Sequence, residues 1–399
     1  MRARTEAKYV GGLCLAVASC LWVGQLAWAQ APAASTAITE QEASILGLQP
    51  EGKIPPQRIQ ETYRKILLDW SAGQTDRAPD ELIELETAVV VDGEIGTRKT
   101  LLKAEQAVIH QVGAADLEVL VPIAVLHHQA YRRLLERGWR GEAMAMVHTR
   151  TMARDLAVLY HQQSGSEGAA LVSSRLLTSL GGLLLQTSQQ LPAAEMFQQA
   201  IELDGRNTAA LIGLAAVYEK NAQAESAVKL LRRAVEVDPG NAEGKLRLAL
   251  NLKRVDQRDE ARKLLEGLTA VGESTWVTPL AFQELARLYS DQEKAAEAEK
   301  VLRQALKRFP DDARLTIQLA AVLDRRGEAR EATALVETLL AASSSTREAA
   351  SSRYLYNTVR PEAFAEARSF LDENSRSRLP VLSQALNAPA DAGGTGVGR

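Results

Sequence analysis

Apolar residues recur at spacings of three and four along most of this chain, which is the pattern of helices that bury one face. Glycine, serine, aspartate or proline separates the segments that carry the pattern. In the first half of the chain the pattern predicts helices over residues 58–70, 81–90, 97–112, 116–137, 141–163 and 167–187. Pro122 is expected to kink the fourth of these helices or to delay its start, because proline has no backbone N–H. The predicted fold class is all-α.

From about Ser174 onward the apolar pattern becomes periodic. One element of the period is Ala-x-x-x-Phe/Leu-x-x-Ala, at residues 193–200, 227–234 and 298–305. A second helix precedes each of these, with Leu-Gly/Ala-x-x-Leu/Tyr at residues 180–184, 214–218 and 285–289. A turn with Gly, Pro, Asn or Asp follows each, at residues 204–207, 238–241 and 309–312. Two weaker units fit the same frame, at residues 248–265 and 319–336.

This pattern resembles the tetratricopeptide repeat, which has Leu-Gly-x-x-Tyr in helix A, Ala-x-x-x-Phe in helix B and Pro at the exit. The helix-A tryptophan of that repeat is absent from all units. The resemblance implies an α-α superhelical solenoid, because a single helix pair cannot bury its apolar face alone and must stack on its neighbours. The predicted repeats are 174–207, 208–241, 242–275, 279–312 and 313–346, with about three extra residues between the third and the fourth.

The assignments of the remaining segments are predicted from their composition and from the requirement that a repeat array be capped. Residues 58–173 are predicted to be irregular helices that are similar to degenerate repeats of the same kind. Residues 347–387 are predicted to supply capping helices, at 347–357 and 362–373, because a repeat array needs a polar end. Residues 30–57 are predicted to be a flexible tether and residues 388–399 a disordered tail, since both are rich in small, Pro or Gly residues.

The first 29 residues resemble a bacterial signal peptide. Arg2 and Arg4 begin a positive segment, an apolar stretch follows, and Ala27-Trp28-Ala29 supplies the small-x-small pattern of a cleavage site before Gln30. Two alternatives stay open: an uncleaved membrane anchor, and a lipoprotein in which Cys20 is lipidated. The predicted location is the periplasm or cell envelope, or outside the cell.

Composition and charge exclude several classes of function. The only cysteines are Cys14 and Cys20, so cleavage after Ala29 removes disulfides, thiol catalysis and cysteine-bound metals. A formal net charge of −3 does not suit a nucleic-acid binder, which needs surplus Lys and Arg to neutralise phosphates. The expected partner is another protein or a peptide segment, with membrane contact only through a lipid anchor. Oligomeric state is not predicted.

No motif for catalysis, metal binding or phosphate binding was found. The five histidines lie at residues 110, 127, 128, 148 and 161, without an HExxH motif or a carboxylate at helical spacing. His127 and His128 point in different directions if they share a helix. Gly181-Gly182 lacks a preceding strand and indicates close helix packing. We therefore predict no catalytic residue, no metal and no cofactor.

The inner surface of the predicted solenoid is the remaining candidate site, because helix A lines it in the family that the sequence resembles. That frame predicts a groove for an amphipathic or mildly acidic segment; the alternative is that the protein's own helices fill it. Clamping of a chaperone's C-terminal carboxylate is not expected, because inner positions hold residues such as Ile212 and Ala216. The predicted groove residues are Arg175, Glu219, Lys220, Leu250, Lys253, Arg254, Gln283, Arg287, Asp291, Asp324 and Arg325, and the same frame places Thr178, Ile212, Leu246 and Ile317 in the groove.

Three hypotheses for function follow. The first is an exported scaffold that mediates protein–protein interaction and is not an enzyme. The second is a subunit of an envelope export or assembly complex, anchored by lipid at Cys20. The third is an enzyme or metal-binding protein whose site lies among the irregular helices near His127 and His148.

Overall fold

The computed structural model describes residues 54–90, 95–113, 116–138, 143–270, 276–342 and 364–387. By its contacts the chain divides into Met1–Gln57 and Arg58–Arg399, and the architecture below is that of the second unit. The described residues form helices and no strand, which confirms the all-α class. The predicted signal peptide, nearly all of the tether, the helix at 347–357 and the tail lie outside the described residues.

The helices before the repeats confirm the six that the apolar pattern predicts, with ends that differ by a few residues. Pro122 lies in the first turn of its helix, where its missing N–H costs no hydrogen bond. A 3-10 turn precedes that helix, capped by the Asp116 carboxylate, so proline delays the helix start as expected. These helices are α3 (Pro56–Ser71), α4 (Ala78–Val89), α5 (Ile95–Gly113), η1 (Leu117–Val119), α6 (Leu120–Arg137), α7 (Ala143–Ser164) and α8 (Glu167–Gln186).

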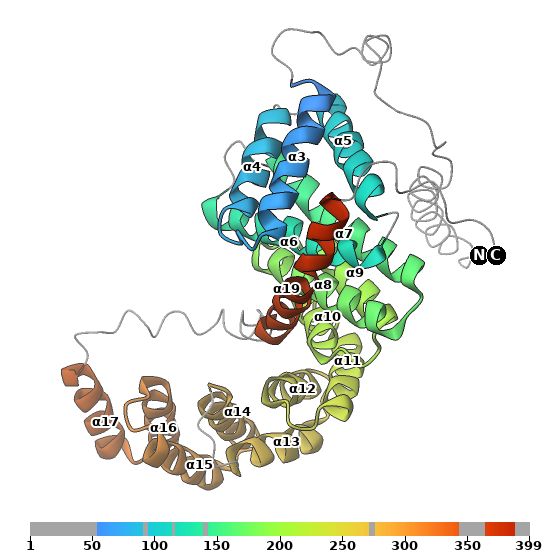
Figure 1. The fold of residues 1–399 in the computed structure, drawn as a ribbon. Coiled ribbons are helices and arrows are strands. Elements are labelled where there is room, and N and C mark those ends of the chain that lie inside the picture. The colour runs from blue at the N-terminus through green and yellow to red at the C-terminus, as the bar shows by residue number, and fades with distance from the viewer. Residues whose placement is uncertain are drawn as a thin grey trace, which may run out of the picture. The chain divides into compact units, whose positions relative to one another are not determined.

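The predicted repeats are present as five antiparallel helix pairs that stack in sequence order. α8 supplies helix A of the first pair, and each later A helix packs on the B helix that precedes it in the chain (Figure 1). The A helices α12, α14 and α16 form one row and contact one another, whereas α13 and α15 form the other row (Figure 1). The helices after α8 are α9 (Gln190–Leu203), α10 (Thr208–Lys220), α11 (Ala224–Val237), α12 (Ala242–Arg254), α13 (Arg258–Ala270), α14 (Val277–Asp291), α15 (Ala295–Arg308), α16 (Ala313–Arg325) and α17 (Ala329–Ala342).

Short side chains at the turns set where the A helices α10, α12 and α16 begin. Asn207 Oδ1 accepts a hydrogen bond from the backbone N–H of Ala210 at 3.1 Å, and Asn241 Oδ1 accepts one from Gly244 at 2.8 Å. Asp312 does the same for the A helix of the fifth pair. Each cap satisfies a backbone N–H that the helix leaves without a partner at its first turn.

The turn between helix A and helix B gives an independent measure of the repeat length. One residue in each such turn has a positive φ: Ser188, Ala222, Asp256, Glu293 and Gly327. These residues are 34 apart, except that 37 separate Asp256 from Glu293 (293 − 256). The spacing of these turns is therefore three residues longer between the third and fourth repeats than between the others.

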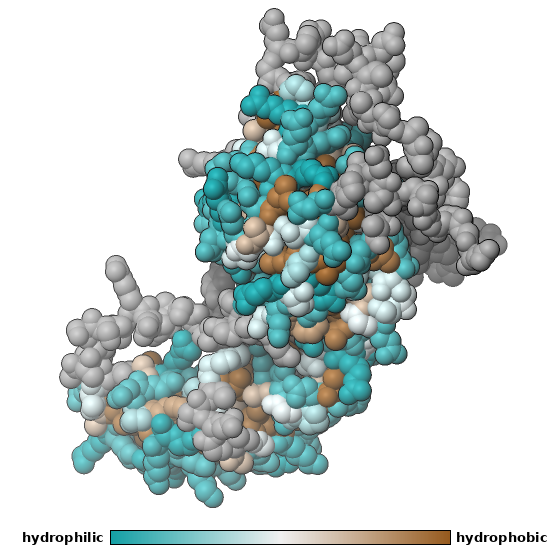
Figure 2. All heavy atoms as spheres, in the orientation of Figure 1, coloured by the Kyte–Doolittle hydropathy of each residue, from teal (hydrophilic) through white to brown (hydrophobic). Residues whose placement is uncertain are grey.

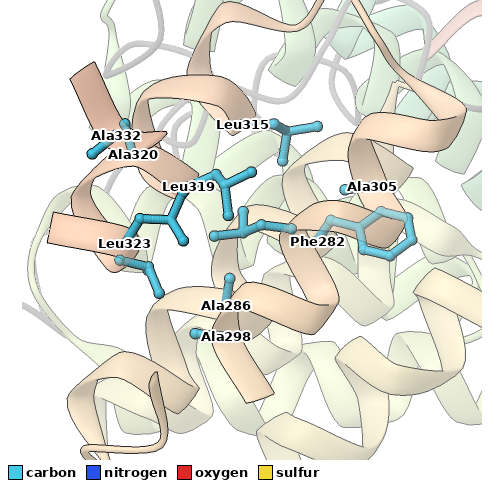
Figure 3. Packing of buried hydrophobic residues seen from close by; sticks show 11 residues of the cluster. Phe282, Ala286, Ala298, Ala305, Leu315, Leu319, Ala320, Leu323 and Ala332 are labelled. Atoms are coloured by element: carbon cyan, nitrogen blue, oxygen red, sulfur yellow. The ribbon is translucent and has the colours of Figure 1, made fainter. Parts of the chain in front are cut away.

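Large and small side chains alternate in the core of the stack, as the repeat pattern predicts. In the fourth and fifth repeats, Phe282, Leu302 and Leu319 belong to one cluster of buried side chains from neighbouring helices, and Figure 3 shows Phe282 and Leu319 within it. Ala286 and Ala298 lie where two helices approach closely. All five side chains are at most 2% exposed, so burial of apolar surface between successive pairs stabilises the array.

The glycine pair in α8 also serves packing, as predicted. An added Cβ at Gly181 would lie 2.8 Å from the ring of Phe197, and one at Gly182 would lie 2.8 Å from the ring of Phe364. Among the described helices α8 alone is long and apolar enough to cross a membrane, but most of it is buried inside this fold. Its apolar character is therefore that of a core helix.

The C-terminal helix α19 (Ala365–Asn387) corrects one prediction. It was expected to cap the fifth repeat, but it packs instead on α6 and α8, with further contacts to η1 and α5 (Figure 1). Its apolar face, with Leu371 and Leu382 buried, covers those helices, and the preceding Phe364 stacks on Phe197 with ring centroids 6.1 Å apart. An ion pair between Arg378 and Glu118 fastens it to η1.

Candidate partner-binding groove

The inner surface of the repeat stack can be followed through one position of helix A. That position holds Gly182, Ala216, Leu250, Arg287 and Ala321 in the five repeats, and we call it the inner column. Its residues are buried in the first two repeats, half-buried in the third and exposed in the fourth and fifth. The inner surface is therefore covered at its start and open at its end.

The chain's own C-terminal segment covers the start of the inner column. Phe364 lies against Gly182, and the Arg175 guanidinium lies 5.9 Å from the centroid of the Phe370 ring, over its face. Arg175, predicted to contact a partner, thus contacts α19. For the first repeat, the alternative that the protein's own helices fill the groove is what the structure contains.

Buried ionic contacts support the middle of the groove wall. The Glu219 carboxylate of α10 accepts hydrogen bonds from Arg247 Nη1 and Asn251 Nδ2 of α12, both at 2.7 Å. Burial raises the pKa of Glu219, although Arg247 opposes that shift. Burial alone would lower the pKa of Arg247, but attraction to Glu219 and Glu243 outweighs it, and that pKa is raised. This network joins two A helices and leaves Glu219 unavailable to a partner.

A second set of polar contacts joins α12, α14 and α16. Lys253 Nζ donates to Glu284 Oε2 at 2.6 Å, and Arg287 Nη1 donates to Glu284 Oε1 at 2.9 Å. The Gln318 side chain donates to the backbone carbonyl of Gln283 at 2.9 Å. Lys253 is half-buried in these contacts, whereas the guanidinium of Arg287 remains more than half exposed.

An open pocket of about 350 Å³ lies between α16 and α17, at the end of the inner column. Ile317 is 50% exposed and Val336 38% exposed, although both are large aliphatic side chains. Figure 2 shows hydrophobic atoms among hydrophilic ones on the face that the later repeats present. The pocket is lined by Ile317, Ala320, Ala321, Asp324, Ala332, Thr333, Val336 and Glu337.

The pocket contains residues that the sequence placed in the groove and others that it did not. Ile317 and Asp324 were predicted groove residues. Val336 and Glu337 were missed, because Val336 occupies the core position of helix B that Leu302 holds one repeat earlier. Leu302 is fully buried, and α17 is the last helix of the stack among the described residues. The sequence feature that could have identified Val336 as a pocket residue is its place in the last predicted repeat.

The predicted groove residues fall into three classes of exposure. The buried members form the groove wall, and the half-buried members border it. Those that face solvent are concentrated in the third to fifth repeats. The exposed residues are Arg254, Arg287, Asp291, Asp324 and Arg325; the half-buried ones are Arg175, Lys220, Leu250 and Lys253; the buried ones are Glu219 and Gln283.

The neighbouring residues His127 and His128 of α6 point in different directions, as predicted. His128 Nε2 lies 2.8 Å from the Ser179 hydroxyl, whereas His127 Nε2 lies 2.9 Å from the Tyr63 hydroxyl. His127 and His148 lie together, with ring centroids 6.5 Å apart. Glu86 and Glu105 adjoin them from α4 and α5. The sequence search missed these carboxylates because it sought metal ligands spaced along one helix.

Comparison with known proteins bears on the repeats. The family model described as a tetratricopeptide repeat matches residues 193–243 and 289–352. No curated protein matches the chain. Its fold resembles that of several solved structures over less than half of this chain, at low sequence identity.

Three of these structures illustrate the range. MamA from Desulfovibrio magneticus is 14% identical, with 44% of this chain and 97% of that one covered and a TM-score of 0.39. YrrB, described as a TPR protein with an unusual peptide-binding site, is 16% identical over 45% and 91%, with a TM-score of 0.36. The kinesin-light-chain-like repeats of Podosopora anserina are 23% identical over 44% and 97%, with a TM-score of 0.38. The periodic sequence, the stacked helix pairs and the match of the family model over residues 193–243 and 289–352 together show that the chain contains tetratricopeptide repeats.

Proposed function

We propose that this protein is a non-catalytic scaffold that binds a partner protein along the inner surface of its third to fifth repeats. The observation that carries the proposal is the change in exposure along the inner column. Phe364, just before α19, covers its first position, whereas Ile317 and Val336 lie exposed beside its far end. Exposed aliphatic side chains around a pocket are typical of surfaces that bind another protein.

The chemistry of this surface indicates the kind of segment that would bind. An apolar side chain of the partner would enter the pocket lined by Ile317 and Val336. The exposed cations Arg254 and Arg287 precede the pocket along the A helices and would attract carboxylates. A helix or extended peptide with one apolar anchor and acidic flanking residues fits both features.

Recovery of partners from an envelope extract tests the groove. We expect Ile317→Asp with Val336→Asp, and separately Arg254→Glu with Arg287→Glu, to reduce recovery of a bound partner at least about tenfold, which corresponds to 1.4 kcal/mol of binding free energy. Quantitative mass spectrometry of proteins retained by the immobilised full chain provides the measurement. Lys253 stays unchanged in these variants so that buried Glu284, which loses its contact with Arg287, keeps one cationic partner.

Two control variants match these changes away from the groove. Leu191→Asp places the same charge at a leucine that is 77% exposed on α9. Arg232→Glu reverses the charge of an exposed arginine on the outer helices, which pairs with Glu260, as Arg287→Glu reverses that of an exposed arginine on the inner helices. Recovery of the same proteins in the same amounts by groove variants and controls would overturn the proposed site.

We further propose that the protein acts after export, in the periplasm or cell envelope. The support is the sequence of the first 29 residues, with its positive start, apolar stretch and Ala27-Trp28-Ala29. Mass spectrometry of the native N-terminus is expected to give Gln30. A lipid-modified Cys20 would favour the anchored subunit instead, and an intact Met1 on a protein found in the cytoplasm would exclude export.

A further inference from the structure

Five polar side chains meet inside the helical bundle that precedes the repeats, each from a different helix. They are Tyr63 of α3, Glu86 of α4, Glu105 of α5, His127 of α6 and His148 of α7. None is more than 1% exposed. Buried carboxylates are costly unless they are paired and hydrogen-bonded, so this cluster requires a physical explanation.

Hydrogen bonds within the cluster satisfy only part of it. His148 Nε2 lies 2.6 Å from Glu105 Oε2, and His127 Nε2 lies 2.9 Å from the Tyr63 hydroxyl. Both Glu86 oxygens, Glu105 Oε1 and His127 Nδ1 have no hydrogen-bond partner. His127 Nδ1 lies 3.4 Å from Glu86 Oε1. Four buried polar atoms of the cluster are therefore without a hydrogen bond.

The negative charges of the two carboxylates are also not balanced by a lysine or arginine among the described residues. The ion pairs of Glu86 and Glu105 in the described structure are with histidines, not with lysine or arginine. Carboxylates bind a metal in their deprotonated form. Two bound carboxylates carry two negative charges, which one divalent cation would balance.

The ligand atoms are close enough for such a cation. One atom each from Glu86, Glu105 and His148 lies within 4.8 Å of the others. Two ligands of one ion can be at most about 4.2 Å apart when each bond is about 2.1 Å, so small side-chain rotations close the site. Imidazole nitrogen with carboxylate oxygen is a ligand set that zinc, iron and manganese ions accept.

We propose that Glu86, Glu105 and His148 bind one divalent transition-metal ion that ties α4, α5 and α7 together. His127 orients Glu86 through Nδ1, and the Tyr63 hydroxyl, by donating to His127 Nε2, keeps the proton on that Nδ1. Because every member is buried, the ion has a structural role rather than an open coordination position for a substrate. The site is separate from the partner-binding groove.

Metal content and metal-dependent stability of the full chain test the proposal. Protein purified from cells is expected to hold about one equivalent of a divalent transition metal by elemental mass spectrometry. After treatment with a chelator, added Zn²⁺ should bind with that stoichiometry and raise the temperature of unfolding. Tyr63→Phe should weaken Zn²⁺ binding about 10- to 100-fold, as loss of an orienting partner does in other metal sites.

Variants of the ligands separate metal binding from a merely buried polar cluster. Glu86→Gln and His148→Gln should abolish both the bound metal and the stabilisation by Zn²⁺. Without a metal, Glu86→Gln would relieve repulsion from Glu105 and leave the protein equally or more stable. His128→Gln is the matched control, because it alters a buried histidine that contacts Ser179 instead of the cluster.

Three results would overturn the proposal. The first is a wild-type chain that is metal-free as purified and shows no saturable binding of Zn²⁺, Mn²⁺ or Fe²⁺. The second is a Glu86→Gln variant that binds Zn²⁺ as wild type does. The third is a Glu86→Gln variant that is more stable than wild type. If ligand variants fail to fold, the titration of the wild-type chain with Zn²⁺ decides.

Discussion

Replacing Phe197 by alanine is expected to lower the free energy of unfolding by about 3–5 kcal/mol, the range for large-to-small changes at buried aromatic residues. Phe197 is completely buried. Its ring fills the space that the absence of side chains at Gly181 and Gly213 leaves, and it stacks on Phe364. The ring thus joins the first repeat, the second repeat and the C-terminal segment. Urea denaturation followed by circular dichroism gives the value.

A double-mutant cycle with Gly213 makes this prediction specific. A Cβ at Gly213 would lie 2.5 Å from the Phe197 ring, so Gly213→Ala alone should destabilise the protein. In the Phe197→Ala background the added methyl enters the vacated space, and the double variant should lose less stability than the sum of the single variants. Leu191→Ala, at an exposed leucine, should change stability by less than about 0.5 kcal/mol. Additive losses at residues 197 and 213 would contradict the packing described.

Acidification is expected to destabilise the protein through His128 as the pH falls below the ordinary histidine range. Burial, with repulsion from Arg132 and Arg368, lowers the pKa of His128 from 6.5 to about 3. Between these values the unfolded chain binds a proton that the folded chain does not, so stability rises with pH across this window. Each unit of acidification there costs about 1.4 kcal/mol, and about 2 kcal/mol is lost by about pH 5.

Replacing His128 by glutamine should flatten this dependence. Glutamine can keep a hydrogen bond to the Ser179 hydroxyl and does not titrate. Urea denaturation at several pH values between about 7 and 4 should give a slope that is shallower by roughly 1 kcal/mol per pH unit than in wild type. The exposed His110 provides the control, as His110→Gln should leave the slope unchanged. Equal slopes in wild type and His128→Gln would contradict a neutral, buried His128.

The local pattern of the sequence determined the helices and the repeat. Apolar spacing predicted α3 to α8 to within a few residues, because each of these helices buries one face. The Ala-x-x-x-Phe/Leu motif predicted the stacked pairs, because small and large positions recur wherever two helices must approach and then pack on a third. The sequence predicted which face of the A helices forms the groove, but not which of its residues are exposed. Ile317 and Asp324 line a pocket, whereas Glu219 is buried in the wall. Register says which helix face a residue occupies, but not which neighbour covers it.

Contacts between residues far apart in the chain were decided only by the tertiary structure. The sequence showed that α19 has an apolar face, but that face could have covered the end of the array as well as α6 and α8, where it lies. Glu86, Glu105 and His148 come from three helices with no common motif, so only packing brings their side chains together. Periodicity fixes local structure because it acts within one helix pair, whereas long-range pairing depends on which complementary surfaces are free to meet.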